Sequence, residues 1–191
     1  LVKEAQNRGA ASAAFIFEPH PARVLSPQRA PKLLVTAERK AELLEDLGLQ
    51  YLIYHPFTPE MARTSPRDFV EKLLVGILGV KHIAVGFNYT FGHKGTGTAE
   101  MLREMGSEYG FTVHIVPAVE LDGEVVSSSL VRSYLEKGAI ERASRLLGYY
   151  PMLEGLVVEG EKRGSTIGFP TANLAVPADL SIPGRGVYAA R

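Results

Sequence analysis

The sequence predicts an α/β fold in which a parallel sheet covered by helices is followed by a short segment of β-structure. Two observations carry this prediction. Apolar, β-like runs alternate with amphipathic stretches over the first 148 residues, and repeated units of this kind are typical of parallel sheets. The helical period then stops near Pro151, where Gly-rich turns begin. We therefore expect one domain over residues 1–148 and a second over 149–191.

The expected elements follow from hydrophobic period and end signals. Ser65 and Pro66 have the chemistry of a helix N-cap and first position, and Gly110 suits a helix end. Helices are expected over residues 1–9, 37–48, 65–79, 98–110, 127–138 and 140–148. Strands are expected over residues 13–17, 51–57, 82–87, 111–119, 152–164 and 186–191.

Composition excludes several classes of protein. The chain has 191 residues, 46% of them hydrophobic, which is typical of a globular domain with a core. Its formal net charge of zero lacks the basic signature of nucleic-acid or membrane-surface binding, and no apolar run approaches the ~20 residues of a membrane helix. The absence of cysteine excludes disulfides and thiolate metal sites and permits the reducing cytoplasm, where we expect the protein. Assembly into a homo-oligomer is compatible with this composition.

The stretch FEPHP (17–21) follows the first expected strand. Ligands of parallel sheets bind at the carboxyl ends of the strands, so His20 is placed to meet an anionic ligand. A proline-stiffened loop with an incidental histidine explains the same residues.

The stretch GFNYTFGHKGTGT (86–98) follows the third expected strand. It brings Asn88 together with the aromatic side chains Phe87, Tyr89 and Phe91, a combination that can stack on a flat ring and hydrogen-bond to it. A surface loop that places one Phe in the core is the alternative.

The stretch VSSSLVR (126–132) opens an expected helix with three hydroxyls. Ser127, Ser128 and Ser129 would aim donors at one point, and Arg132 lies within the next turn, as in a phosphate site. Capping of the helix requires only one serine, so it accounts for part of the pattern.

The stretch GEKRGSTIGFPTANL (160–174) combines glycines with basic and oxygen-bearing side chains. Glycines at 160, 164 and 168 let the backbone approach a phosphate closely, beside the charges of Lys162 and Arg163. A hairpin turn followed by a strand is the alternative interpretation.

Within that stretch, side-chain alternation in an extended segment would point Thr171 and Asn173 to the same side and Ala172 towards a core. Both outward side chains carry oxygen, which is the ligand atom that Mg²⁺ prefers.

In this order, the four stretches resemble motifs of the bacterial bifunctional riboflavin kinase/FAD synthetase family. The resemblance extends along essentially the whole chain, and the last stretch is the most specific match. Glu18 stands where Asp is common in the family, and Val126 and Ser129 are mild variants.

The resemblance implies a Rossmann-like nucleotidyltransferase domain that joins FMN and ATP to give FAD and pyrophosphate. It implies that the start of a six-stranded antiparallel β-barrel follows, a kinase that phosphorylates riboflavin with MgATP. ATP, riboflavin and FMN would then be the partners of the protein, with Mg²⁺ as cofactor and no nucleic acid or membrane.

The resemblance also implies roles for individual residues. In the first domain, the catalytic residues would be His20 at the ATP phosphates, Asn88 beside nucleotide and flavin, and Arg132, with the aromatics of the Asn88 loop on the flavin. The phosphate-binding residues would be Ser127, Ser128 and Ser129 there, and Gly160, Arg163, Gly164 and Ser165 in the kinase. Thr171 and Asn173 would bind Mg²⁺ and phosphate.

Two family elements are absent from residues 1–191: the His-x-Gly-His motif, expected before Leu1, and the catalytic glutamate of the kinase, expected after Arg191. We therefore expect a fragment with little kinase activity and impaired adenylyltransferase activity. One alternative is another nucleotidyltransferase, of the pantetheine-phosphate or nicotinamide-mononucleotide type, although such an enzyme would lack the Pro-Thr-Ala-Asn module. The other is a non-catalytic regulator that binds flavin or nucleotide.

Overall fold

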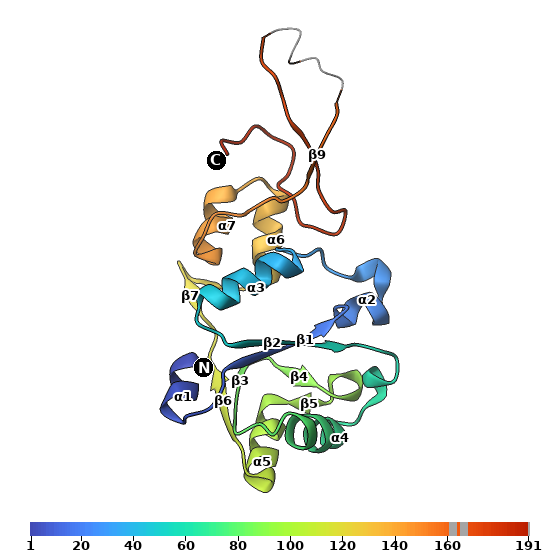
Figure 1. The fold of residues 1–191 in the computed structure, drawn as a ribbon, viewed down its shortest axis with the longest axis vertical. Helices are drawn as coiled ribbons and strands as arrows, with labels where there is room; N and C mark the ends of the chain where they lie inside the picture. Colours follow the sequence, from blue (N-terminus) through green and yellow to red (C-terminus); the bar gives the residue numbers. More distant parts are fainter. Residues whose placement is uncertain (161–163, 165–167, 191) are drawn as a thin grey trace. The chain divides into compact units, whose positions relative to one another are not determined.

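The structure is a computed structural model that describes residues 1–160, 164 and 168–190 (Figure 1). Its contacts divide the chain into two compact units. The first unit comprises Leu1–Pro31 and Leu43–Val119, and the second comprises Lys32–Glu42 and Glu120–Arg191. The domain boundary expected at 148–149 stays a prediction.

The elements of the first unit alternate between strands and helices. Its helical segments are α1 (Val2–Asn7), α2 (Pro21–Leu25), η1 (Pro27–Arg29), η2 (Met61–Arg63), α4 (Pro66–Asp68), η3 (Phe69–Ile77), η4 (His93–Gly95) and α5 (Ala99–Tyr109). Its strands are β1 (Ala13–Glu18), β2 (Tyr51–Pro56), β3 (His82–Gly86), β4 (Thr90–Phe91), β5 (Gly97–Thr98) and β6 (Thr112–Val116).

The predicted parallel pairing is confirmed. Strand β1 runs parallel to β2 with Ala13 opposite Tyr51, and β3 runs parallel to β6 with His82 opposite Thr112. Strands β4 and β5 form a short antiparallel pair in the loop between β3 and α5. The carboxyl ends of β1 and β3 therefore lead directly into the loops that carry His20 and Asn88.

The predicted helix over 65–79 is confirmed, with a difference in its winding. Ser65 caps it, since its hydroxyl accepts a hydrogen bond of 3.0 Å from the amide of Asp68. After the single turn of α4, the segment η3 is a π-helix, in which the amide of Leu78 donates to the carbonyl of Leu73 five residues earlier.

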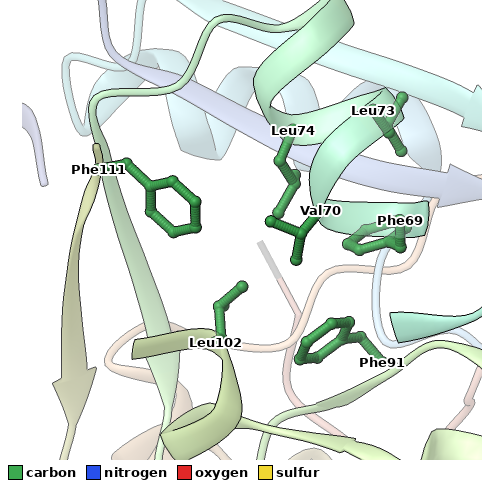
Figure 2. Packing of buried hydrophobic residues seen from close by; sticks show 7 residues of the cluster. All are labelled: Phe69, Val70, Leu73, Leu74, Phe91, Leu102 and Phe111. Carbon is green, nitrogen blue, oxygen red and sulfur yellow. The ribbon is translucent and has the colours of Figure 1, made fainter. Parts of the chain in front are cut away.

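The core of the first unit is a cluster of apolar side chains between η3, α5 and the strands (Figure 2). Phe15 of β1 and Ile83 of β3 both pack against this cluster, so the two parallel pairs share one core. Burial of each such side chain contributes about 1.5–3 kcal/mol. The buried members are Phe69, Val70, Leu73, Leu74, Phe91, Leu102 and Phe111.

The second unit contains α6, α7 and short strand pairs. Its elements are β7 (Glu120–Leu121), β8 (Glu124–Val125), α6 (Ser128–Glu136), α7 (Ile140–Leu147), β9 (Leu156–Val158) and β10 (Asn173–Ala175), while α3 (Ala37–Asp46) begins in this unit and ends in the first. Helices α6 and α7 lie side by side around a small core of Val131, Tyr134, Leu135 and Ala143 (Figure 1).

Strands β9 and β10 pair antiparallel with Asn173 opposite Val158, as expected of a β-rich second segment. Three local expectations are corrected here. Among the described residues of the strand expected over 152–164, only β9 forms a strand, and the described residues 186–190 contain no strand. Ala172, expected to face a core, is exposed, because neither face of the β9–β10 pair is covered in the described residues.

In the ranges that the structure describes, no helix combines the length and the apolar character needed to cross a bilayer.

The core of the first unit predicts a large difference between two identical substitutions. Leu102→Ala, at a side chain that is 1% exposed, should lower the free energy of unfolding by about 2–5 kcal/mol through lost burial and a cavity. Leu47→Ala, at a side chain that is 72% exposed, should change it by less than about 0.5 kcal/mol. Urea unfolding measures both, and equal losses would contradict the described core.

Candidate functional site

His20 stands at the entrance of α2, just beyond the carboxyl end of β1. Its side chain is exposed, and its Nδ1 accepts a hydrogen bond of 3.1 Å from the amide of Ala22. Because Nδ1 acts as the acceptor, the neutral ring carries its proton on Nε2. The local backbone therefore holds the ring in a tautomer that can donate to an anionic ligand.

Asn88 lies in the exposed turn that follows β3. Two backbone hydrogen bonds stabilise this turn. The amide of Phe87 donates to the carbonyl of Val116 over 2.9 Å, and the amide of Tyr89 donates to the carbonyl of Gly86 over 3.0 Å. The side chain of Phe87 is 54% exposed, so its ring is available to a flat ligand.

The other two aromatics of this loop face inward. Phe91 is only 6% exposed and belongs to the core of the first unit, and the ring of Tyr89 stacks on it with centroids 5.8 Å apart. Burial raises the pKa of Tyr89. A Cβ at Gly97 would lie 2.7 Å from the Phe91 ring, so glycine is required opposite it. Packing accounts for Phe91, and of the three rings expected to contact flavin, that of Phe87 is the most exposed.

The serine-rich stretch lies in the second unit, at the amino end of α6. The hydroxyl of Ser127 accepts a hydrogen bond of 3.2 Å from the amide of Leu130 and thus caps the helix. This is the capping role that the sequence offered as the alternative to a phosphate site. Ser128 and Ser129 are exposed in the first turn, where the helix dipole favours negative charge. Capping thus accounts for Ser127, whereas an anion would account for all three.

Arg132 follows one turn later and is partly buried. Its Nε donates to the carbonyl oxygen of Lys32 over 2.6 Å, and burial lowers the pKa of Arg132. The guanidinium stays charged because the ordinary pKa of arginine lies far above neutrality. With Nε engaged, the two terminal nitrogens are the pair that can meet phosphate oxygens. Sequence reasoning missed Lys32, which is 100 residues away and takes part through its backbone.

Gly160 and Gly164 approach the residues expected to bind metal. A Cβ at Gly160 would overlap the side-chain amide of Asn173, and one at Gly164 would lie 3.1 Å from the hydroxyl oxygen of Thr171. The structure thus brings together four of the expected kinase residues. The other two, Arg163 and Ser165, lie outside the described residues.

The oxygen atoms of Thr171 and Asn173 are compatible with Mg²⁺, although neither is charged. No cluster of three His, Cys, Asp or Glu side chains that could hold a metal occurs among the residues described. A metal at this position would therefore depend on phosphate oxygens for much of its coordination shell.

A hydrogen-bonded pair that the sequence did not signal secures the hairpin of β7 and β8 just before Ser127. The hydroxyl of Tyr134 on α6 donates to the carboxylate of Glu124 over 2.6 Å, and this bond raises the pKa of Tyr134. The guanidinium of Arg142 lies 5.6 Å from the same ring. A ten-residue spacing between Glu and Tyr has no motif character, so only the fold reveals the pair.

The Ser127 cap can be tested apart from any ligand. Ser127→Ala should lower the free energy of unfolding by about 0.5–2 kcal/mol, because the amide of Leu130 loses its acceptor. Ser127→Asn, which retains a side-chain oxygen, should remain near the parent value. Thermal or urea unfolding gives both numbers, and equal stability of the two variants would contradict the cap.

Comparison with known families gives two matches that follow one another along the chain. Residues 1–130 match the FAD synthetase family, and residues 147–191 match the riboflavin kinase family. A solved structure described as a macrolide-efflux protein from Streptococcus pneumoniae superposes with a TM-score of 0.85 at 31% identity, covering 97% of this chain and 60% of that one.

Three relatives are each named bifunctional riboflavin kinase/FMN adenylyltransferase. The protein of Listeria monocytogenes is 39% identical over 100% of this chain, that of Bacillus subtilis 36% over 98%, and that of Escherichia coli 34% over 99%. The chain spans 62%, 59% and 60% of their respective lengths. With a family match over residues 1–130 and a riboflavin kinase match after it, the chain belongs to the FAD synthetase family.

Proposed function

We propose that this protein makes FAD in two steps, phosphorylating riboflavin to FMN and then joining FMN to the adenylyl group of ATP. The observation that supports the proposal is that residues suited to binding phosphate lie in two different stretches of the chain. One is the serine turn of α6 with Arg132, and the other is the pair of glycines packed against Thr171 and Asn173. The first precedes and the second lies within the riboflavin kinase match.

In the adenylyl transfer, an oxygen of the FMN phosphate attacks the α-phosphorus of ATP. The bond from that phosphorus to the bridging oxygen of the β-phosphate breaks, and pyrophosphate leaves. In the second unit, Ser128, Ser129 and Arg132 would neutralise charge that develops on phosphate oxygens. In the first unit, the proposed role of His20 is a hydrogen bond from Nε2 to a phosphate of ATP. Asn88 and Phe87 would hold nucleotide and flavin in place.

In the phosphorylation, the terminal hydroxyl of the ribityl chain attacks the γ-phosphorus of ATP, ADP leaves and the hydroxyl proton passes to a base. Gly160 and Gly164 would let backbone amides approach the phosphates, with Arg163 and Ser165 completing this loop. Mg²⁺ bound beside Thr171 and Asn173 would neutralise phosphate charge. Both side chains would position the phosphates through their oxygens.

Two rival functions are less well supported. A nucleotidyltransferase acting on pantetheine phosphate or nicotinamide mononucleotide would leave the riboflavin kinase match of residues 147–191 without a role. A regulator without catalysis is disfavoured because the relatives that match 98–100% of this chain are named as bifunctional enzymes. Because both reactions would consume ATP, we propose that the protein acts in the cytoplasm. We propose no nucleic acid as a partner.

The two-site proposal is tested by a pair of substitutions in the full-length protein. Asn173→Ala should lower FMN formation from riboflavin by about 10²-fold, because an oxygen at the phosphates is lost, and should leave FAD formation from supplied FMN unchanged. Arg132→Ala should do the reverse. Separation of FMN and FAD by chromatography measures both, and equal loss of both activities in a folded Asn173→Ala protein would refute the proposal.

The flavin role of the Asn88 loop is tested by comparing two phenylalanines. Phe87→Ala should raise the Kd for FMN about tenfold through lost stacking, with little change in stability, because the ring is 54% exposed. Phe91→Ala should instead lower the free energy of unfolding by about 3–5 kcal/mol. Fluorescence titration and urea unfolding distinguish these outcomes, and unchanged FMN affinity in Phe87→Ala would contradict the role.

A further inference from the structure

A short segment of the riboflavin kinase match lies along residue 33 of the FAD synthetase match. The amide of Leu33 donates to the carbonyl of Asp179 over 2.8 Å, and the amide of Ser181 donates to the carbonyl of Leu33 over 2.7 Å. Leu33 and Leu180 thereby form a parallel bridge. Leu180 is 2% exposed and Ser181 is 8% exposed, so this contact is buried.

The peptide group between Lys32 and Leu33 links this bridge to Arg132. Its N–H is the group that donates to Asp179, and its C=O is the group that accepts from Nε of Arg132 over 2.6 Å. The peptide is planar, so its two polar ends cannot turn independently. A hydrogen bond made by the N–H also polarises the C=O and strengthens the bond at the other end.

The same segment holds the carboxyl end of the helix that carries Arg132. The amide of Gly184 donates over 2.8 Å to the carbonyl of Leu135 near the end of α6, which also accepts from the amide of Gly138 over 2.9 Å. A Cβ at Gly184 would overlap the carbonyl oxygen of Glu136, so the backbone is in direct contact with the helix. The segment Asp179–Gly184 therefore fixes both the Arg132 side chain and its helix.

We propose that Asp179–Gly184 is a positioning element for adenylyl transfer, although it belongs to the riboflavin kinase match. It acts through the Lys32–Leu33 peptide, which orients the guanidinium so that its terminal nitrogens face the phosphates. This proposal rests on the proposed role of Arg132. It means that residues of one module set the efficiency of the reaction carried out by the other.

The test compares two proline substitutions in the full-length protein. Ser181→Pro removes the N–H that donates to Leu33. Ala178→Pro is the matched control, because residue 178 follows Pro177 in a turn closed by the bond from the Leu180 amide to the Pro177 carbonyl, a position that suits proline. Initial rates of FAD formation from supplied FMN and varied ATP give kcat and KM.

We expect Ser181→Pro to lower kcat/KM for ATP about tenfold and Ala178→Pro to leave it unchanged. Each proline is then combined with Arg132→Lys, which cannot make the Nε bond. In the Arg132→Lys background, Ser181→Pro should have no further effect on kcat/KM. The hydrogen bond from Nε of Arg132 to Lys32, through which Ser181→Pro would act, is already lost there. If Ser181→Pro acts only by general structural damage, its fold-loss in kcat/KM should multiply with the fold-loss caused by Arg132→Lys. That result would overturn the proposal.

If the parent protein forms FAD and Ser181→Pro matches Ala178→Pro, the positioning element is refuted and the proposed function stands. If the parent forms no FAD from FMN and ATP, the proposed function itself fails. If Ser181→Pro does not fold, Leu180→Ala enters the same cycle with Arg132→Lys. A non-multiplicative loss then supports the positioning role, and a multiplicative loss or no loss overturns it.

Discussion

The peptide group between Lys32 and Leu33 is the interaction on which the second unit depends. Its carbonyl holds Arg132 of α6, and its amide holds the segment that begins at Asp179. Residues far apart in the chain are thus joined by one planar group with no side chain of its own. Their grouping into one compact unit follows from these bonds and from the packing of α6 and α7.

The first unit follows a different constraint, which is the shared core beneath two parallel strand pairs. Because β1 and β3 pack against the same buried side chains, the loops at their carboxyl ends are anchored by apolar burial. Phe91 shows how closely function and stability are joined in such a loop. The motif that carries Asn88 also supplies a member of the core, so its aromatics divide between inner and outer positions.

Glycine has an equally specific part in the second unit. At residue 160 a Cβ would overlap the side-chain amide of Asn173, and at residue 164 it would overlap the carbonyl oxygen of Phe169 and lie 3.1 Å from the hydroxyl oxygen of Thr171. Such close approach lets the backbone and two side-chain oxygens act on one ligand. The exposed β9–β10 pair presents these groups without a covering core in the described residues.

The sequence by itself determined the order of the main helices and strands over residues 1–148, the cap at Ser65 and the positions of the four motifs, because these depend on local period, turn chemistry and residue type. It did not determine the π-helical winding of η3, the inward direction of Phe91 or the limits of the last strands. Only the tertiary structure decided those, and only it brought Lys32 to Arg132 and Asp179 to Leu33. Backbone hydrogen bonds between distant residues leave no trace in side-chain patterns, since every residue but proline carries the same donor and acceptor.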